Sequence, residues 1–234
     1  MATAHYSITL NDVLFYWPKA DKPTLHIPNL RIEVGKALFI KGPSGCGKST
    51  LLSLLTGINT PTSGDIHILD RDMSTLSAGA RDAFRANHIG YIFQQFNLIP
   101  YLSVLENVTL PCHFSTSRKK NVTLELEEQA KQILLNLQLP EHLIHSPVIE
   151  LSIGQQQRVA AARALIGSPE IIIADEPTSA LDHDNRSTFL KLLLTQVRKT
   201  HSTLIFVSHD PTIEHHFDEV INLMALNKAA ETQL

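Results

Sequence analysis

The stretch that decides the fold is Gly42-Pro43-Ser44-Gly45-Cys46-Gly47-Lys48-Ser49. It fits the pattern G-x-x-x-x-G-K-[ST], and it lies between an apolar strand-like run over 37–41 and an apolar run over 48–55 that predicts a short helix. Small residues let the backbone wrap a phosphate group, and successive N–H groups at the helix N-terminus supply positive potential. The sequence therefore predicts a phosphate-binding loop rather than a glycine-rich turn with an incidental lysine.

Two polar side chains at the end of this loop have predicted roles. Lys48 is expected to reach the β- and γ-phosphates of a nucleoside triphosphate, and the Ser49 hydroxyl is expected to hold Mg²⁺.

A fully apolar run over 171–174 is followed directly by Asp175 and Glu176. Such a run is typical of a strand buried on both faces, and ligands bind at the carboxyl ends of strands in open α/β sheets. Taken alone, a carboxylate pair after a strand is often only a cap. Combined with a phosphate loop, it favours Asp175 as a Mg²⁺ ligand through water and Glu176 as the base that orients or deprotonates the attacking water.

The stretch Leu151-Ser152-Ile153-Gly154-Gln155 narrows the class of NTPase. It resembles the signature of ABC ATPases, which is usually Leu-Ser-Gly-Gly-Gln. The resemblance covers essentially the whole chain, because the other motifs of the family follow in order. It implies an ATP-hydrolysing enzyme that uses ATP and Mg²⁺ and that forms a homodimer when ATP binds.

Three further positions carry this resemblance. Gln94, in Tyr-Ile-Phe-Gln-Gln over 91–95, matches the glutamine that joins the two subdomains and senses Mg²⁺. Asp182, in Ser-Ala-Leu-Asp over 179–182, matches the loop that communicates between protomers. His209 follows a strand-like run and matches the histidine that contacts the γ-phosphate.

An aromatic residue before the phosphate loop is expected to stack on adenine, since a flat base suits an aromatic ring. Trp17 stands at the family's position, and Tyr16 or Phe15 could take the role instead. With the loop residues and the signature, the resemblance gives this ATP-binding set: Trp17, Gly42, Ser44, Gly45, Cys46, Gly47, Lys48, Ser49, Thr50, Ser152, Gly154, Gln155 and Asp182.

In this family the signature supplies the other half of a split site. Ser152, Gly154 and Gln155 would face the γ-phosphate bound by a second protomer, using a hydroxyl, an N–H group and a helix N-terminus. Ile153 departs from the family's glycine and would be strained if its backbone needed a positive φ. We expect the position to tolerate a side chain that points away.

The order of strand-like and helical patterns predicts an α/β fold with a mostly parallel sheet and a helical insertion. The resemblance adds a P-loop NTPase core of RecA-like type and an N-terminal antiparallel β subdomain. We expect one ABC ATPase domain over 5–228, with its core in 5–93 and 166–228 and its helical subdomain over about 94–165. Local patterns predict strands over 8–14, 30–34, 37–41, 65–69, 171–175 and 203–208, and helices over 48–55, 123–139 and 155–166.

Two further local predictions concern the helical insertion. A capping box at Ser103 to Glu106 starts a helix, which Pro111 is expected to stop. The polar run over 115–121 is expected to be a loop.

Composition restricts the setting of the protein. The chain has 234 residues and a formal net charge of -3, so nothing in the charge leads us to expect nucleic-acid binding. Cys46 lies in the phosphate loop, where a disulfide would block the ligand, so a reducing cytosol is expected. The first six residues do not resemble a signal peptide, and the aliphatic runs are shorter than the roughly 20 residues of a spanning helix. We therefore expect a peripheral position on the cytoplasmic face of the inner (plasma) membrane, through an integral membrane permease.

The segments over 91–100 and 102–108 resemble the group of lipoprotein-release, macrolide-export (MacB-like) and cell-division ATPases. In that group, ATP-driven closure is converted into export or mechanical work by the membrane partner. The alternatives are a soluble ABC ATPase of the iron–sulphur assembly type and a motor that gates a cell-wall enzyme without transport. We expect docking through the segment from Phe96 to Glu106, with Leu98 to Leu102 at least partly exposed.

Overall fold

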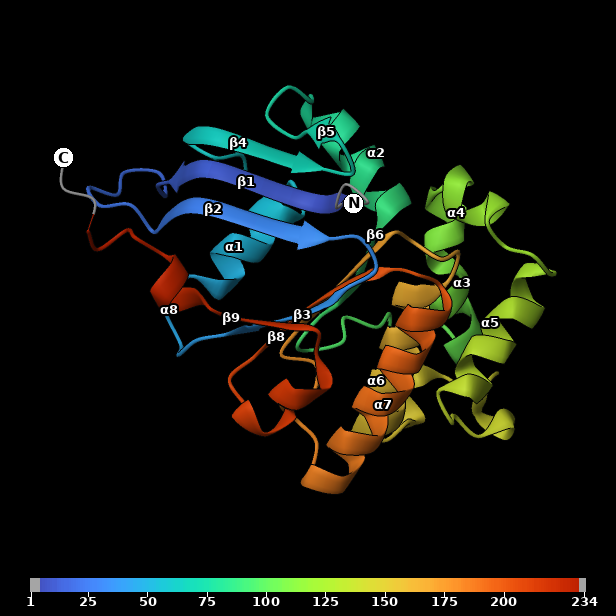
Figure 1. Cartoon of the computed structure of the whole chain (residues 1–234). Coiled ribbons are helices and arrows are strands. Elements are labelled where there is room, and N and C mark those ends of the chain that lie inside the picture. The colour runs from blue at the N-terminus through green and yellow to red at the C-terminus, as the bar shows by residue number, and fades with distance from the viewer. Residues whose placement is uncertain (1–4, 232–234) are drawn as a thin grey trace. The chain divides into compact units, whose positions relative to one another are not determined.

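The computed structural model describes residues 5–231, so residues 1–4, which bear on the signal-peptide argument, lie outside the described part. The chain forms two compact units. Described residues 5–85 and 209–231 make the first unit, and residues 86–208 make the second. Figure 1 labels most elements of both.

The first unit contains an antiparallel sheet in the order β2-β1-β4-β5 (Figure 1). Residues of β1 alternate between its two faces, and every apolar side chain from Ile8 to Phe15 except Leu14 is buried, as expected for a strand with one face on a core. Leu10 pairs with Leu30 on one side and with Ile66 on the other. The bounds are β1 Tyr6–Phe15, β2 Leu25–Glu33, β4 Ser63–Ile68 and β5 Arg71–Asp72. The expected antiparallel β subdomain is confirmed.

The same unit carries the strand and helix that flank the phosphate loop. β3 (Ala37–Lys41) is buried along most of its length and pairs in parallel with β9 (Glu219–Asn222). α1 (Lys48–Leu55) follows the loop and buries its leucines. Other elements are a 3₁₀ helix over Pro211–His216 and α8 (Leu223–Leu226), together with most of α2 (Ala78–His88), whose last three residues belong to the second unit.

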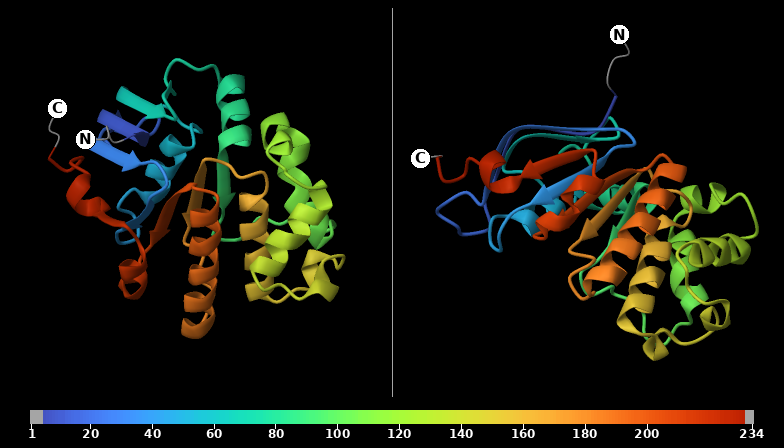
Figure 2. Two further views of the ribbon diagram at one scale, coloured as in Figure 1. Left: turned by 45° about the vertical axis from the view of Figure 1, so that its right-hand side comes forward. Right: turned by 60° about the horizontal axis from the view of Figure 1, so that its bottom comes forward.

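In the second unit three parallel strands pair in the order β6-β7-β8. Helix α6 contacts β6, α3, α5 and α7, and Figure 2 shows it in gold between the strands and the green helices. The bounds are β6 Ile89–Ile92, α3 Val104–Phe114, α4 Thr116–Lys120, α5 Leu126–Asn136, α6 Ile153–Leu165, β7 Ile171–Asp175, α7 His183–Lys199 and β8 Thr203–Ser208, with 3₁₀ helices over Glu141–Leu143 and Val148–Glu150. The predicted α/β class with parallel strands is confirmed.

Two local predictions for the helical insertion are wrong. Pro111 lies inside α3 instead of ending it. Proline costs a helix interior about 3 kcal/mol, but α3 buries Val104, Leu105 and Val108, and tertiary packing outweighs that cost. The polar run over 115–121 contains helix α4, which Ser115 caps by accepting a hydrogen bond from the Arg118 N–H at 3.0 Å.

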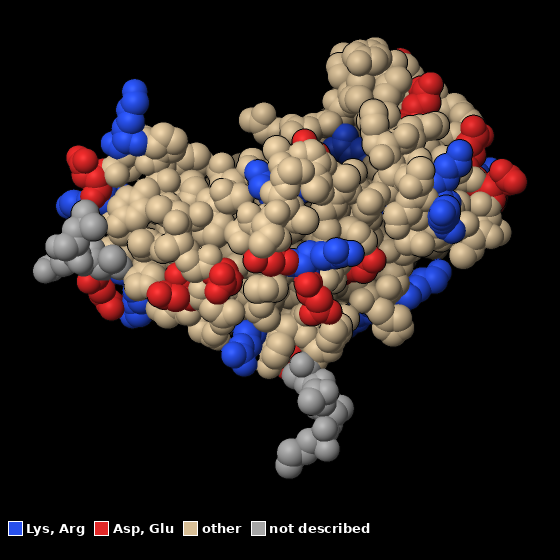
Figure 3. Space-filling view, turned by 90° about the horizontal axis from the view of Figure 1, so that it is seen from above, with Lys and Arg blue, Asp and Glu red and all other residues tan. Residues whose placement is uncertain are grey.

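Acidic and basic side chains are both present on the surface that Figure 3 shows. A mixed surface provides little long-range attraction for a polyanion. Within residues 5–231, no helix has the length and apolar character that crossing a bilayer requires.

Candidate nucleotide-binding and catalytic site

The phosphate loop has the backbone that its glycines make possible. Gly45 and Gly47 have φ values of 83° and 103°, in the left-handed region that disfavours other residues. A Cβ on Gly47 would lie 2.7 Å from the Leu25 side chain, so the loop also packs too closely for a larger residue. Gly47 is the N-cap of α1, and the N-terminus of that helix therefore points into the loop.

Most of the polar side chains at the end of the phosphate loop are at least partly open to solvent. The Lys48 ammonium donates to the carbonyl oxygens of Gly42 and Pro43, at 2.6 and 3.2 Å, so it lies across the loop. Ser44 and Ser49 are exposed, whereas Thr50 is buried. The arrangement is able to bind a polyphosphate chain through backbone N–H groups and one ammonium.

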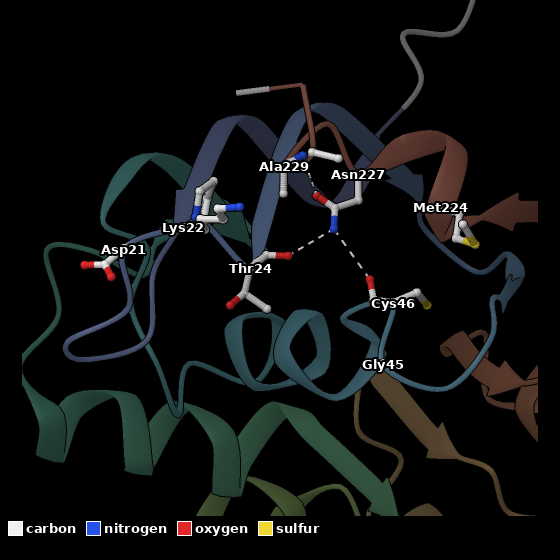
Figure 4. Close-up of a pocket in the computed structure, with 10 residues that line it drawn as sticks. Asp21, Lys22, Thr24, Gly45, Cys46, Met224, Asn227 and Ala229 are labelled. Atoms are coloured by element: carbon white, nitrogen blue, oxygen red, sulfur yellow. Dashed lines mark hydrogen bonds between the residues drawn. The ribbon is translucent and has the colours of Figure 1, made fainter. Parts of the chain in front are cut away.

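A hollow of about 870 Å³ adjoins this loop (Figure 4). Its walls come from the β1–β2 loop, from the phosphate loop and from the C-terminal segment: Asp21, Lys22, Pro23, Thr24, Gly45, Cys46, Met224, Asn227, Ala229 and Ala230. The Cys46 thiol is partly exposed there, as expected for an unpaired cysteine of this loop.

Asn227 ties these three segments together, and the sequence analysis did not find it. Its amide group donates to the carbonyl oxygens of Thr24 at 3.0 Å and of Cys46 at 3.5 Å, and Figure 4 shows both bonds. Its amide oxygen accepts from the His26 N–H at 2.9 Å and from the Ala229 N–H at 3.1 Å. One side chain thus fixes the C-terminal segment against the phosphate loop. A lone asparagine far along the chain gives no signal of this in sequence.

We expect Asn227→Ala to lower the free energy of unfolding by about 1–3 kcal/mol, because several backbone groups lose their partner. ATP affinity should fall with it, since the loop loses one of its anchors. Calorimetric unfolding and nucleotide titration measure the two effects. Met224→Ala is the matched control, because Met224 lines the same hollow but is 61% exposed. Equal behaviour of the two variants would contradict this role of Asn227.

Of the three aromatic candidates for adenine, the structure favours Trp17. Phe15 is buried at 5% exposure and cannot offer a free ring face, so that alternative is wrong. Tyr16 is half-buried, whereas Trp17 is 45% exposed. Its ring packs on Phe15 in a T-shaped arrangement with centroids 5.1 Å apart, and nearly half of the side chain stays open to solvent. Trp17 lies outside the lining of the hollow beside the loop, so its contact with adenine stays a prediction.

If Trp17 stacks on adenine, Trp17→Ala should weaken ATP binding by about 1–3 kcal/mol, the scale of base–aromatic stacking. Trp17→Phe should retain much of the affinity, because it keeps a ring. Equilibrium titration with ATP and with inorganic triphosphate distinguishes a base contact from a phosphate contact. Unchanged ATP affinity in Trp17→Ala would assign the role to Tyr16 or to neither residue.

The catalytic candidates of the second unit meet at one edge of its sheet. Asp175 ends β7, and Glu176 follows it with a φ of 46°, unusual for a residue other than glycine. The Glu176 N–H donates to the Val207 carbonyl at 2.9 Å, which holds the backbone in this conformation. Left-handed residues of this kind cluster at functional sites, where they turn a side chain out of a strand.

Asp175 has a neighbour that the sequence analysis gave no catalytic role. The Tyr91 hydroxyl lies 3.5 Å from its carboxylate. Burial, together with this negative charge, raises the pKa of Tyr91, so the phenol stays protonated and can donate to Asp175.

Gln94 lies two residues beyond β6, which pairs with β7 through Ile92 and Ala174. It is exposed and reaches the same edge of the sheet as Asp175. The backbone after it turns sharply, since Phe96 and Asn97 have φ values of 60° and 49°. Arg163 of α6 fixes this turn by donating to their carbonyl oxygens at 2.5 and 2.6 Å.

The signature residues begin helix α6. The Ser152 hydroxyl accepts from the Gln155 N–H at 3.4 Å, and the Gln155 side chain accepts from the Ser152 N–H at 2.8 Å. This is a capping box, and it starts the helix two residues earlier than the sequence analysis placed it. Ser152 is exposed, so its hydroxyl and the helix N-terminus face outward from the chain.

Ile153 is not strained. It is the first residue of α6, does not have a positive φ, and is 54% exposed. The expectation that its side chain points away is confirmed. Gly154 is the next residue of the helix, and a Cβ there would only reach ordinary contact distance, 3.7 Å, from Leu181.

One hydrogen bond connects the signature helix with the loop after β7, and Asp182 caps the next helix. Gln157 of α6 is fully buried and donates to the Pro177 carbonyl at 2.6 Å, directly after Glu176. Asp182 is the N-cap of α7 and accepts from the Asn185 N–H at 2.9 Å. His209 follows β8 directly and is exposed.

Comparison with known proteins decides the family. The profile of the family described as "ABC transporter" matches residues 25–179, which contain the phosphate loop, the signature and strand β7 with Asp175. The chain belongs to the ABC transporter family. It is therefore an ATP-binding protein and an ATPase of the ABC type, as the sequence analysis predicted.

Relatives support the predicted group. The chain is 38% identical over 195 residues to the lipoprotein-releasing system ATP-binding protein LolD of Xanthomonas campestris pv. campestris, covering 83% of this chain and 80% of that protein. It is 39% identical over 204 residues to the macrolide export ATP-binding/permease protein MacB of Rhodopirellula baltica, covering 87% of this chain but only 29% of that protein. A dimeric structure of the ABC transporter cassette MJ0796 is 34% identical, with a TM-score of 0.79, covering 93% of this chain and 95% of the other.

A post-hydrolysis dimer of the same cassette, bound to ADP and Pi, matches with the same TM-score of 0.79 at 33% identity. These neighbours confirm the P-loop NTPase fold.

Proposed function

We propose that this chain is the ATP-hydrolysing subunit of a transporter of the MacB and LolD type, acting as a homodimer on an integral membrane permease. The observation that carries the proposal is the presence in one chain of a formed phosphate loop, an exposed signature at a helix N-terminus and a glutamate turned out behind the catalytic strand. A single chain offers one of each, so two copies provide two composite sites. The dimeric cassettes among its structural relatives support this arrangement.

Within each composite site, different residues bind the phosphates, close on the γ-phosphate and accept the proton of the attacking water. Backbone N–H groups of residues 42–49 and the Lys48 ammonium bind the phosphates of ATP, and Ser152 with the N-terminus of α6 closes on the γ-phosphate from the other copy. Glu176 accepts a proton from the attacking water, and His209 contacts the γ-phosphate. Closing of the dimer on ATP and reopening after hydrolysis would then drive the permease.

Mg²⁺ fits the polar groups available. Ser49, Asp175 and Gln94 offer a hydroxyl, a carboxylate and an amide, which are oxygen ligands of the kind that Mg²⁺ prefers. The Tyr91 hydroxyl is a hydrogen-bond donor to the Asp175 carboxylate and would help to orient it. When bound, the ion would neutralise the charge that develops on the transferred phosphoryl group.

The permease contact is proposed at the segment from Phe96 to Glu106. Phe96 is buried at 8% exposure and belongs to the core, whereas Tyr101 is 84% exposed. Leu98, Ile99 and Leu102 are half-buried, so the expected partial exposure of this stretch is confirmed. Asn107 fixes it by binding the backbone of Ile99 through two hydrogen bonds of 2.8 and 3.1 Å. Such a rigid, apolar and partly exposed surface suits a helix of the permease.

Charged substitutions at Leu98 and Tyr101 test this function. In the protein's own cells, Leu98→Glu/Tyr101→Glu should lower the amount of the subunit that stays bound to the cytoplasmic face of washed membranes. The isolated double variant should still fold and bind ATP. Ile58→Glu, at an equally apolar position with 59% exposure in the first unit, is the control and should remain on the membrane. A double variant that remains membrane-bound and active would place the contact elsewhere, and a wild-type chain absent from membranes would contradict the proposed function itself.

A further inference from the structure

The segment that returns to the first unit after β8 begins with His209. The 3₁₀ helix over Pro211–His216 comes next, and β9 then pairs in parallel with β3 (Figure 1). His209 is the residue proposed to contact the γ-phosphate, and β3 leads directly into the phosphate loop. The way in which this segment is attached to β3 therefore affects where His209 lies relative to a bound phosphate.

Contacts at the beginning and middle of β3 fix the part of the segment that precedes β9. The Ala37 N–H donates to the Asp218 carboxylate at 2.8 Å, and the Asp218 N–H donates to the Ala37 carbonyl at 2.9 Å. The Phe39 and Phe217 rings pack with centroids 5.1 Å apart. These residues follow the 3₁₀ helix, so the contacts hold the end of the segment that is further from His209 along the chain.

The 3₁₀ helix itself depends on its neighbours for its position. It has six residues, and Ile213 is the one that it buries. Hydrogen-bond geometry is poorer in a 3₁₀ helix than in an α-helix, so such short pieces are not rigid on their own. The Asp210 carboxylate caps the helix by accepting from the Thr212 N–H at 2.9 Å, but this hydrogen bond lies within the segment.

An ion pair joins the 3₁₀ helix to the end of β3. The Lys41 ammonium donates to both carboxylate oxygens of Glu214, at 3.1 and 3.0 Å. The Lys41 side chain is 38% exposed and the Glu214 side chain 21% exposed. Lys41 directly precedes Gly42, whose carbonyl oxygen accepts from the Lys48 ammonium at 2.6 Å. The pair thus connects the helix after His209 with the first residue of the phosphate loop.

The Lys41–Glu214 pair is suited to fixing a position rather than to stabilising the fold. Partly exposed ion pairs add little to the free energy of unfolding, because solvent screens the charges and two long side chains lose freedom. The pair nevertheless restricts where the 3₁₀ helix can lie relative to the phosphate loop. Its removal should leave the other contacts between the segment and β3 intact.

We propose that Lys41 and Glu214 are positioning residues for His209. Their ion pair keeps the segment that carries His209 against the phosphate loop, so that the histidine reaches the γ-phosphate. This inference rests on the proposed role of His209. A misplacement of about 1 Å can cost on the order of 10²-fold in rate, so a pair that adds little stability can still control turnover.

The alternative role for Lys41 is direct binding of the phosphates of ATP, because it is a second ammonium beside the loop. The two roles predict different kinetics. If Lys41 binds phosphate and Glu214 competes for it, Lys41→Met raises the KM for ATP and Glu214→Gln lowers it. If the pair positions His209, both substitutions lower kcat and leave KM alone.

Steady-state ATP hydrolysis by variants of the full chain distinguishes these roles. Lys41→Met and Glu214→Gln should each lower kcat roughly tenfold, with the KM for ATP within about twofold of wild type, since only the placement of His209 changes. The double variant should be no slower than either single one, because each substitution already breaks the same contact. Lys131→Met and Glu141→Gln are the matched controls and should retain the wild-type kcat. They break an ion pair of 2.8 Å in the second unit, whose lysine has the same 38% exposure.

Two further variants separate positioning from a general effect on folding. Lys41→Arg keeps the charge and should retain most of the wild-type kcat. In a His209→Ala chain, Lys41→Met should not lower the residual rate further, because the residue that it positions is gone. Thermal unfolding should give similar midpoints for the wild type, Lys41→Met and Glu214→Gln.

A wild-type kcat in both Lys41→Met and Glu214→Gln, or an equal loss in the control variants, would overturn the inference. A rise in KM with Lys41→Met alone would also overturn it and would make Lys41 a phosphate ligand. The same holds if Lys41→Met slows the His209→Ala chain as much as it slows the wild type. Wild-type turnover by His209→Ala would instead contradict the proposed role of His209, and the inference would fail with it.

Discussion

Glu176→Gln is expected to abolish ATP turnover, to leave ATP binding intact and to trap an ATP-bound dimer. The amide keeps the size of the side chain but cannot accept the proton of the attacking water. Loss of a general base costs typically 10²–10⁴-fold in rate, so the measured ATPase activity should fall by about that factor. Size-exclusion chromatography with ATP and Mg²⁺ should show the variant as a dimer and the wild type mainly as a monomer.

The structure explains why this glutamate, rather than another, is expected to act. Its φ of 46° turns it out of β7, and the hydrogen bond from its N–H to Val207 keeps it there. Glu150→Gln is the control, because Glu150 is an exposed carboxylate of the same unit outside the catalytic loop. Wild-type turnover by Glu176→Gln would remove Glu176 as the base, and a similar loss in both variants would indicate a general effect of charge.

The strands and loops that bear the site could be predicted from sequence, because their signals are local. β3, β7 and β8 are continuous apolar runs, and the structure places all three at the predicted bounds. The phosphate loop needs glycine at positive φ, and that requirement is visible in its motif.

The helices of the second unit were predicted less well, since long-range packing determines them. Pro111 stays in α3 and α4 forms from a polar run because both helices pack on neighbours that no local pattern reveals. Helix α7 was not placed at all. Its start is capped by Asp182, which the sequence analysis assigned to communication between protomers and to the ATP-binding set but not to a helix cap.

Side chains that act through packing also escaped the sequence analysis. Arg118 belongs to a run of basic residues that looks like a solvated loop, yet it alone of the three is buried. Arg163 and Gln157 lie on a helix whose first residues carry the signature, and their hydrogen bonds to Asn97 and Pro177 depend on tertiary contacts. A single sequence marks the residues that face the ligand better than those that hold them in place.

Restored activity in mixed dimers is the second large effect expected. Lys48→Ala removes the phosphate-binding ammonium, and Ser152→Arg places a bulky cation at the start of α6. Both positions are at least partly open to solvent, so each chain should fold. A homodimer of either variant has two damaged sites. A mixed dimer has one site with both halves intact and one with both halves damaged, because each composite site joins the phosphate loop of one copy to the signature of the other.

Equal mixing should restore about one quarter of the wild-type ATPase rate if sites act independently, since half of the randomly paired dimers are mixed and each of these holds one intact site of two. Two affinity tags, purified in sequence, isolate the mixed dimers. The matched control mixes Lys48→Ala with Ser49→Ala, which damages the phosphate loop of both chains and leaves no intact site in any pairing. Mixed dimers that form but stay inactive would mean either that one intact site cannot turn over alone or that the site is not shared. Covalently joined pairs of chains, in which only one copy carries Ser152→Arg, distinguish these two explanations. If the site is shared, the substitution removes activity at the phosphate loop of the other, unaltered copy.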